Sequence, residues 1–354
     1  MTAYLVLQNG TVMKGEYFGA IGEITGEVVF ATGMTGYLET LTDLSYYGQI
    51  VLQTFPLIGN YGVIPADFES AAVGVRAYIT KYPCQAPSNF RSEGSLDNFL
   101  RERGIIGLCG IDTRALTKII RKNGVMNGKI TASCPAEADI AETKAYSICN
   151  AVAAVSSRFV VKTMPDSSQV SGRAALRVAL MDFGAKRGIA KALAARGCEV
   201  WSFPHDTSAQ EILNIKPDGI MLSNGPGDPA EDANRGIVET LRVLQSGNVP
   251  IFGICLGHQL LALANGYTTK KLKFGHRGAN QPVKDLSTGR VYITSQNHGY
   301  AVMTDKCYFV NVNDGTCEGM DYGNSFSVQF HPEACGGPLD TAFLFDRFIE
   351  RMRK

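Results

Sequence analysis

Charge and long apolar runs are both scarce in this sequence, and each scarcity excludes a class of protein. Charged residues make up 19% of the 354 residues, and 34 basic against 33 acidic side chains leave a net charge of +1. A chain without a basic excess is not built to hold nucleic acid or an anionic membrane by bulk electrostatics. No apolar run reaches the roughly 18 residues that a membrane-spanning helix needs. The N-terminal residues also lack the pattern of a secretory signal.

The cysteines and histidines show no recognisable ligand pattern. The nine cysteines are odd in number, and no two of them have C-x-x-C spacing. This argues against a disulfide framework and against a thiolate zinc site. The five histidines are scattered through the chain, so we expect no metal site. Free thiols are usual in the reducing cytoplasm, where we expect this protein to act.

What is present favours a globular α/β protein with two domains. The chain is about twice as long as an ordinary domain. Hydrophobic residues make up 45% of it, which is enough for sizeable cores without disulfides or metal. Glycine is abundant, at 38 residues, and this points to many tight turns and close backbone approaches.

Residues 1–135 are predicted to form a strand-rich, mixed α/β domain. Short runs of β-branched and aromatic residues are separated there by glycines and turn dipeptides. A helix over residues 114–121 should begin after the N-cap Asp112 and end at Gly124. Strands are expected at residues 3–7, 12–18, 27–31, 50–55 and 72–79.

Residues 175–354 are predicted to form a doubly wound, mostly parallel α/β domain, after a linker at residues 136–174 that is rich in small and polar residues. Apolar strand segments alternate with helical segments, and this alternation favours a parallel sheet with both faces covered. Further strands should follow Gly266, and a helix at residues 339–353 should close the domain. The alternating segments are strands at 178–181, 199–203, 219–222 and 249–254, and helices at 186–195, 209–213, 233–245 and 256–264.

Cys255 is the candidate nucleophile. A buried strand runs directly into Cys255 and a helix follows at once, with Gly253 and Gly257 two residues to either side. This is the cysteine form of the G-x-S-x-G nucleophile elbow, whose glycines let strand and helix pass closely. The positive end of the following helix favours a thiolate. The alternative is a small buried side chain, as most free cysteines are.

His331 and Glu333 are the candidate base and its orienting carboxylate. His331 follows the apolar segment 326–330, and in an extended segment residues i and i+2 point the same way. A cysteine nucleophile commonly uses such a base, held in place by a third group. Taken alone, His331 would be an ordinary histidine at a strand end.

The remaining histidines are not assigned to the reaction. His258 lies three residues beyond Cys255, and we interpret it as packing on the helix surface or supporting the site. His298 is placed in a turn, where it could line a pocket. His205 and His276 are assigned to loops.

Backbone donors for an oxyanion are expected at two places. Leu256 follows the nucleophile directly, so its N–H is the first candidate. A glycine- and proline-rich loop at residues 223–229 follows a predicted strand, at the end where α/β sheets bind ligands. An ordinary turn between strand and helix is the alternative for this loop.

Three sequence motifs, which follow one another in a characteristic order, point to a specific protein family. N-G-P-G-D-P at residues 224–229, G-I-C-L-G-H-Q at 253–259 and H-P-E at 331–333 resemble the motifs of class I (triad) glutamine amidotransferases. Further segments resemble the small-subunit family of carbamoyl-phosphate synthetases, so that the resemblance covers essentially the whole chain. These segments are residues 33–50, 111–117, 181–187 and 273–283.

The resemblance implies a role for each matching residue. Cys255 would attack glutamine to form a γ-glutamyl thioester and free ammonia, His331 would transfer protons, and Glu333 would orient His331. Gly225 and Leu256 would supply the oxyanion donors. Because Ser45 comes from the N-terminal domain, the site would lie where the domains meet. The residues that would hold glutamine are Ser45, Gly227, Gln259, Asn297, Gly299 and Tyr300.

The sequence departs from the family pattern at a few positions. Leu44 replaces a usual proline, and Tyr300 stands where phenylalanine is common. The segment after H-P-E reads A-C-G-G-P rather than A-S-P-G-P. None of these changes removes a reacting group, and Cys335 lacks the elbow.

The resemblance also implies a partner. The chain has neither a phosphate-binding G-x-x-x-x-G-K-[ST] loop nor a dinucleotide fingerprint, so no cofactor is expected on it. A large synthetase subunit would use ATP and Mg²⁺ to make carbamoyl phosphate from bicarbonate, for arginine and pyrimidine biosynthesis. Two alternatives stay open: the glutaminase component of another synthetase, such as anthranilate or GMP synthase, and a non-catalytic scaffold for the large subunit.

Overall fold

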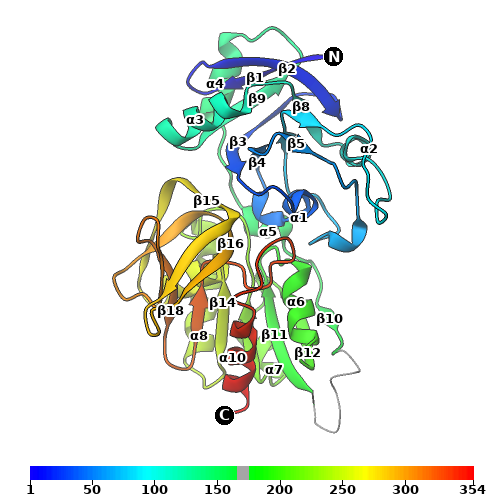
Figure 1. The fold of residues 1–354 in the computed structure, drawn as a ribbon. Coiled ribbons are helices and arrows are strands. Elements are labelled where there is room, and N and C mark those ends of the chain that lie inside the picture. The colour runs from blue at the N-terminus through cyan, green and yellow to red at the C-terminus, as the bar shows by residue number, and fades with distance from the viewer. Residues whose placement is uncertain (166–174) are drawn as a thin grey trace. The chain divides into compact units, whose positions relative to one another are not determined.

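The chain divides into two compact units. The computed structural model describes residues 1–165 and 175–354 (Figure 1). The first unit spans Met1–Cys149 and the second spans Asn150–Lys354. Each unit has its own buried apolar clusters, as expected of separate domains.

The first unit is built around a closed barrel. Its elements are β1 (Thr2–Leu7), β2 (Val12–Gly19), β3 (Ile24–Ala31), α1 (Tyr37–Thr42), η1 (Leu44–Tyr46), β4 (Gln49–Gln53), β5 (Leu57–Ile58), η2 (Pro65–Asp67), β6 (Ala77–Ile79), β7 (Tyr82–Pro83), α2 (Leu96–Glu102), β8 (Ile106–Cys109), α3 (Thr113–Asn123), β9 (Met126–Thr131) and α4 (Glu137–Ala145). The barrel order is β1-β2-β8-β6-β4-β3-β9. β3, β4, β6 and β8 pair in parallel, and the other barrel pairs are antiparallel. Closure leaves no free sheet edge among these strands.

The second unit is built on one mixed sheet. Its elements are α5 (Ala151–Val155), β10 (Val161–Thr163), β11 (Leu176–Asp182), α6 (Arg187–Ala194), β12 (Cys198–Pro204), α7 (Ala209–Asn214), β13 (Gly219–Leu222), η4 (Asp232–Asn234), α8 (Arg235–Gln245), β14 (Ile251–Ile254), α9 (Leu256–Ala264), β15 (Thr268–Asp285), β16 (Val291–Met303), β17 (Phe309–Asn311), β18 (Cys317–Asp321), β19 (Phe326–Val328) and α10 (Phe343–Met352). The sheet order is β10-β12-β11-β13-β14-β19-β18-β16-β15-β17. Strands β12, β11, β13, β14 and β19 form its parallel part.

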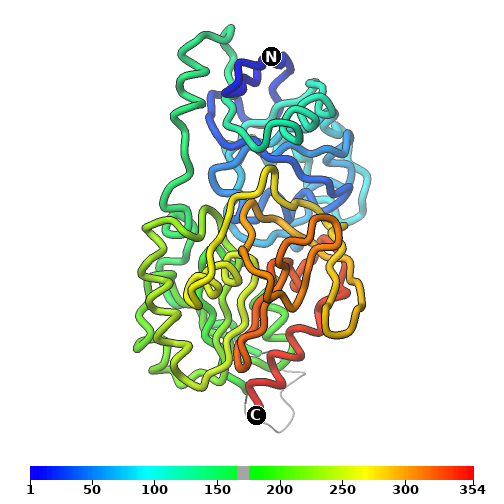
Figure 2. The backbone as a smooth tube through the Cα atoms, turned by 90° about the vertical axis from the view of Figure 1, so that its left-hand side faces the viewer, coloured from blue at the N-terminus to red at the C-terminus, as the bar shows by residue number. Residues whose placement is uncertain are grey.

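Helices cover both faces of the parallel part. Along β11, Val178 and Leu180 face one apolar cluster while Ala179 and Met181 face another, because successive strand residues point to opposite faces. Helices α6 and α10 contribute to the first cluster, and α7, α8 and α9 contribute to the second. The antiparallel strands β15 and β16 run side by side along most of their length, as the yellow and orange tube in Figure 2 shows. This architecture confirms the predicted fold class.

Local signals in the first unit are accurate, with one exception. Asp112 caps α3 by accepting a hydrogen bond from the Ala115 N–H at 2.9 Å, and Gly124 ends that helix. The strand expected at 72–79 is confined to β6, so the first part of that prediction is wrong. Gly74 instead packs on the Asp43 backbone, where a Cβ would lie 2.2 Å from the carbonyl oxygen. This contact holds the chain away from the sheet before β6.

The segment 136–174, interpreted as a linker, contains regular structure. α4 is held to the barrel by Lys129, whose Nζ lies 2.9 Å from Asp139 and 2.8 Å from Glu142. α5 and β10 belong to the second unit, in which β10 pairs with β12. Composition alone did not reveal these contacts, because small and polar residues also form exposed helix faces. Residues 166–174 of the predicted linker lie outside the described residues.

Among the described residues, no helix is both long enough and apolar enough to cross a membrane. All nine cysteines lie within the described ranges, and all are free thiols. Neither unit is therefore held together by a disulfide.

We expect Phe252→Ala to destabilise the second unit by about 3–5 kcal/mol, since a large cavity would remain. Phe252 is fully buried, and its ring centroid lies 4.3 Å from that of Phe326 and 5.8 Å from that of Phe345. Urea unfolding can be followed by the fluorescence of Trp201, the only tryptophan, which lies in β12. Phe159→Ala is the control, because Phe159 is 78% exposed. Equal unfolding midpoints for the two variants would contradict this account of the core.

Candidate active site

Cys255 lies at the turn between β14 and α9, where its backbone is strained. Its φ of 54° and ψ of −104° fall in a region that residues with a side chain rarely adopt. Such strain persists only where the surroundings hold it. Here the Cys255 N–H donates to the Val328 carbonyl at 2.9 Å, and the Gly257 N–H donates to the Ser223 carbonyl at 3.0 Å. The result is a nucleophile elbow, with the thiol at the N-cap of α9.

The glycines on either side of Cys255 are required by close contacts. A Cβ on Gly253 would lie 2.8 Å from the Gly257 carbonyl oxygen. A Cβ on Gly257 would lie 2.6 Å from the Leu222 carbonyl oxygen. Real Cβ atoms do not approach backbone so closely, so any other residue would push α9 away from β13 and β14 and move the thiol.

His331 and Glu333 form a buried pair. The ring nitrogen Nδ1 lies 2.7 Å from Glu333 Oε1, and both side chains are essentially inaccessible to solvent. The expected pairing is present, but the expected reason for it is wrong. The segment is a turn rather than an extended strand, and the Ala334 N–H donates to the His331 carbonyl at 3.3 Å. Pro332 restricts the backbone at this turn, and the turn brings the carboxylate back to the ring.

The electrostatics of this pair favour a protonated ring. Burial and the charge of Lys186 act to lower the pKa of His331, but Glu333 and Cys255 outweigh them and raise it to about 9. Burial acts to raise the pKa of Glu333, but His331 lowers it overall. Because Nδ1 is bonded to Glu333, the second nitrogen Nε2 is left for other chemistry. It is buried and has no hydrogen-bond partner among the described residues.

The two predicted oxyanion donors lie next to each other. Gly225 follows β13, and a Cβ on it would lie 2.3 Å from the Phe183 carbonyl oxygen and 2.8 Å from the Leu256 side chain. Asn224 fixes this loop by accepting from the Lys186 N–H at 3.0 Å and donating to the Gly184 carbonyl at 3.1 Å. The loop is therefore held against α9 and against the residues that follow β11.

Three predicted glutamine-binding residues converge on the same place. The Cys255 thiol lies 3.7 Å from the Asn297 carbonyl oxygen. The Gln259 amide donates to the Tyr300 carbonyl and to Gln329 Oε1, both at 2.8 Å. Asn297 and Tyr300 belong to β16, so this strand of the antiparallel part lies beside the elbow.

The structure places the other predicted residues as follows. Gly299 lies between Asn297 and Tyr300 in β16, and Gly227 has a φ of 91°, which favours glycine. Ser45 is in η1 of the first unit, is 8% exposed, and donates its N–H to Asp43 at 2.9 Å. Its part in the site remains a prediction.

The interpretation of His258 as packing on the helix surface is wrong. His258 is completely buried on the inner face of α9, with Nδ1 2.8 Å from Ser327 Oγ. Burial lowers its pKa to about 3, so the ring stays neutral. Its contact with β19 gives it a supporting position, since it braces the helix that starts at Cys255. His205 lies in the turn after β12, as expected.

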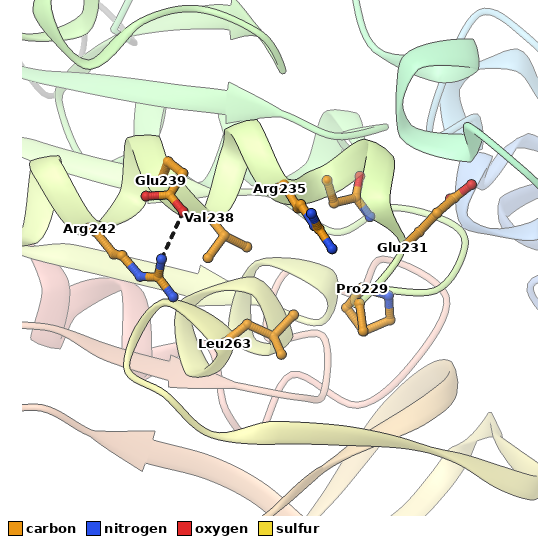
Figure 3. Close-up of a pocket in the computed structure, with 9 residues that line it drawn as sticks. Pro229, Glu231, Arg235, Val238, Glu239, Arg242 and Leu263 are labelled. Atoms are coloured by element: carbon orange, nitrogen blue, oxygen red, sulfur yellow. Dashed lines mark hydrogen bonds and ion pairs between the residues drawn. The ribbon is translucent and has the colours of Figure 1, made fainter.

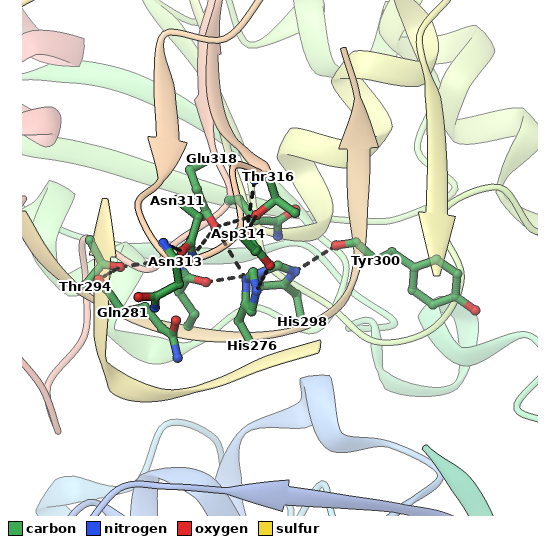
Figure 4. Close-up of polar contacts among 12 residues, drawn as sticks. His276, Gln281, Thr294, His298, Tyr300, Asn311, Asn313, Asp314, Thr316 and Glu318 are labelled. Carbon is green, nitrogen blue, oxygen red and sulfur yellow. Dashed lines mark hydrogen bonds and ion pairs between the residues drawn. The ribbon is translucent and has the colours of Figure 1, made fainter. Parts of the chain in front are cut away.

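The predictions for His276 and His298 are also wrong. Both lie in strands, β15 and β16, rather than in a loop and a turn, and both are buried. With Glu318 of β18 they form the one group of potential metal ligands among the described residues, with ligand atoms within 4.8 Å of one another (Figure 4). Spacing along the chain could not reveal this cluster, because three separate strands supply it.

A cavity of about 400 Å³ lies along α8, apart from these residues (Figure 3). Arg242 and Glu239 at its edge form an ion pair of 2.9 Å, and Arg235 pairs with Asp232 at the same distance. No predicted site residue lines it. The lining residues are Pro229, Ala230, Glu231, Asn234, Arg235, Val238, Glu239, Arg242 and Leu263.

Comparison with known proteins supports one family over the whole chain. The family model of the carbamoyl-phosphate synthase small chain, CPSase domain, matches residues 5–130, and that of the class-I glutamine amidotransferases matches residues 179–351. A carbamoyl phosphate synthase small chain of Clostridium perfringens is 51% identical over 357 residues, which cover 99% of each chain.

Other relatives agree with this comparison. A carbamoyl phosphate synthase small chain of Bacillus cereus is 49% identical over 360 residues, covering 99% of this chain and 95% of the relative. A carbamoyl phosphate synthase pyrimidine-specific small chain of Halalkalibacterium halodurans is 49% identical over 366 residues, covering 99% and 97%. The match over residues 5–130 is to the small chain itself, which argues against the amidotransferase component of another synthetase. The chain belongs to the family of carbamoyl phosphate synthase small chains, and its second unit is a class I glutamine amidotransferase domain.

Proposed function

We propose that this chain hydrolyses L-glutamine at Cys255 and supplies the ammonia to a large carbamoyl phosphate synthase chain. The observation that carries the proposal is the strained elbow at Cys255 beside the buried His331–Glu333 pair. A scaffold without catalytic activity would have no need for this strain or for buried charge. The intact residues therefore favour a working glutaminase.

In the first half of the reaction, the Cys255 thiolate attacks the side-chain carbonyl carbon of glutamine. The C–N bond breaks as the imidazolium of His331 gives its proton to the departing nitrogen, so ammonia leaves and a γ-glutamyl thioester remains. The pKa of His331, near 9, suits a ring that begins the reaction protonated. The N–H groups of Gly225 and Leu256 hold the developing oxyanion.

In the second half, water attacks the thioester. The now neutral His331 accepts a proton from this water and the C–S bond breaks, which restores the Cys255 thiolate. Glutamate is released after its new carboxyl group gives the second proton to solvent. Glu333 keeps the ring oriented throughout, since its bond to Nδ1 leaves Nε2 to carry the proton. Hydroxyl, backbone and amide groups hold the substrate. These belong to Ser45, Gly227, Gln259, Asn297, Gly299 and Tyr300.

The ATP-dependent steps are assigned to the partner. This chain contains no phosphate-binding loop motif, whereas making carbamoyl phosphate from bicarbonate needs phosphoryl transfer from ATP with Mg²⁺. We therefore infer a pair of small and large chains in which only ammonia is exchanged. The carbamoyl phosphate that the pair makes serves arginine or pyrimidine biosynthesis in this proposal.

His331→Asn is expected to lower glutaminase activity about 10²–10⁴-fold, because it removes proton transfer itself. Glu333→Gln is expected to lower it less, because the base is still present. In Glu333→Gln, loss of the carboxylate should lower the pKa of His331 from about 9. The ring then loses its proton at lower pH, and the alkaline limb of kcat/KM moves toward neutral pH. Profiles of kcat/KM against pH test both statements. An unmoved alkaline limb would contradict the role of Glu333.

Cys255→Ser should abolish glutamine-dependent carbamoyl phosphate synthesis by the assembled enzyme, because a hydroxyl is far less ionised than a thiol near pH 7. Synthesis from ammonium salts should continue, since the ATP chemistry lies on the other chain. The measurement is bicarbonate- and ATP-dependent carbamoyl phosphate formation with each nitrogen source. Loss of both activities in a complex that still assembles would refute this division of labour.

Ser45→Ala should raise KM for glutamine while kcat changes little. A lost hydrogen bond to substrate usually costs about 0.5–1.5 kcal/mol, and more if the bonded group is charged. Steady-state glutaminase kinetics of the complex measure both constants. Thr42→Ser is a suitable control in the preceding helix, since it keeps the hydroxyl that bonds to the Leu38 carbonyl. An altered kcat with KM unchanged would place Ser45 away from the substrate.

A further inference from the structure

A buried carboxylate lies where four strands of the antiparallel part meet. Glu318 of β18 is completely inaccessible to solvent. Its Oε2 accepts from the Gln296 amide of β16 at 2.9 Å, and its Oε1 accepts from the Asn311 amide of β17 at 3.0 Å. His276 Nδ1 of β15 lies 3.5 Å from the same Oε1. Figure 4 shows Glu318, Asn311 and His276 pointing toward one another from separate strands.

Gln296 connects this carboxylate to the strand beside Cys255. The Gln296 carbonyl oxygen Oε1 lies 3.0 Å from His298 Nε2, and His298 Nδ1 lies 2.7 Å from the Tyr300 carbonyl oxygen. Burial lowers the pKa of His298, so the neutral ring carries a single N–H and donates to only one of these two oxygens at a time. Glu318, Gln296 and His298 thus form a path of close polar contacts that ends at the Tyr300 carbonyl.

The backbone held by this path contacts each part of the candidate site. The Ser295 carbonyl accepts from the His331 N–H at 2.9 Å. The Asn297 carbonyl lies 3.7 Å from the Cys255 thiol. The Tyr300 carbonyl accepts from Gln259 at 2.8 Å. A shift in this short stretch of β16 would therefore move groups that we assign to glutamine binding.

The cluster is better explained as a hydrogen-bonded network than as a metal centre. Each oxygen of Glu318 already accepts an amide N–H, and a cation between the ligands would have to displace these bonds. His276 has its own counter-charges: Nε2 lies 2.8 Å from Asp314, and Nδ1 faces Glu318. Burial acts to lower the pKa of His276, but the two carboxylates raise it overall. Burial raises the pKa of Glu318, and a protonated His276, shared with Asp314, offsets the charge of its ionised form without a metal.

Burying this charge costs free energy that an apolar residue would not cost. Such a cost is understandable where the backbone must keep a single conformation. Hydrogen bonds are directional, so they exclude other backbone conformations that apolar packing would permit. We propose that Glu318 is a positioning residue for glutamine binding: with His276 as its counter-charge and Gln296 as its bridge, it fixes the backbone at Asn297–Tyr300. This inference rests on the proposed glutaminase function.

The test is Glu318→Gln in the full chain assembled with its large chain. The new side chain has an NH2 group in place of one carboxylate oxygen, and this group faces the NH2 group of Gln296 or Asn311. One hydrogen bond of the network is therefore lost with little change in side-chain volume. We expect KM for glutamine to rise about tenfold or more, with kcat within about twofold, because binding rather than chemistry is affected. A variant that was merely less stable would lower the active fraction and kcat, and would leave KM unchanged.

A labelling experiment on the full chain gives an independent measurement. A glutamine-like diazo-ketone needs the amino-acid binding groups, whereas iodoacetamide needs only a reactive thiol. Glu318→Gln should slow labelling of Cys255 by the diazo-ketone about as much as it raises KM, with the rate for iodoacetamide unchanged. If this variant does not fold, Gln296→Met, which removes the bridge and keeps Glu318, should show the same selective loss.

Asp285→Asn is the matched control, because Asp285 is a buried carboxylate of the same sheet whose contacts are to Ser287 and Thr288. It should keep the KM of the unmodified chain. Unchanged KM in both network variants would overturn the proposal. So would one zinc ion per purified chain, measured by mass spectrometry and lost in Glu318→Gln. Failure of the proposed function would be seen separately, as an unmodified chain that neither hydrolyses glutamine nor is labelled at Cys255.

Discussion

The strained backbone at Cys255 is the constraint on which the candidate site depends. A φ of 54° at a residue with a side chain is unfavourable, and it is maintained by hydrogen bonds to β19 and by the loop that follows β13. The close approach of α9 to β14 and β13 leaves no room for a Cβ at Gly253 or Gly257. The parallel sheet therefore determines where the sulfur lies, and every other group in the site is arranged around that point.

The antiparallel strands contribute further groups to the candidate site that the parallel strands begin. β16 brings the Asn297 carbonyl to the thiol and also anchors the backbone of His331 through Ser295. The turn at Pro332 then sets Glu333 against the ring. Because both members of this pair are buried, their charges interact strongly, and each shifts the pKa of the other toward its ionised form. One sheet thus positions both Cys255, which follows the parallel strand β14, and His331, whose backbone bonds to the antiparallel strand β16.

Predictions from the sequence were most accurate where the signal was local. The helix after Cys255 was predicted at residues 256–264, and α9 has those bounds. The Asp112 cap and the Gly124 stop were likewise readable, because a cap depends on residues only a few positions apart. The three wrong predictions for histidines share a different cause. His258, His276 and His298 were placed from their neighbours in sequence, whereas their environments come from strands elsewhere in the chain.

The sequence by itself determined the two-part organisation, the elbow with its glycines, and the pairing of a histidine with a carboxylate two residues away. These features depend on short-range sterics and on residue type, which the sequence displays directly. Only the tertiary structure decided that the H-P-E segment is a turn, that His331 is buried with a raised pKa, and that Glu318, His276 and Gln296 meet. Strand pairing brings together residues that are far apart along the chain. Their burial then determines how strongly their charges interact.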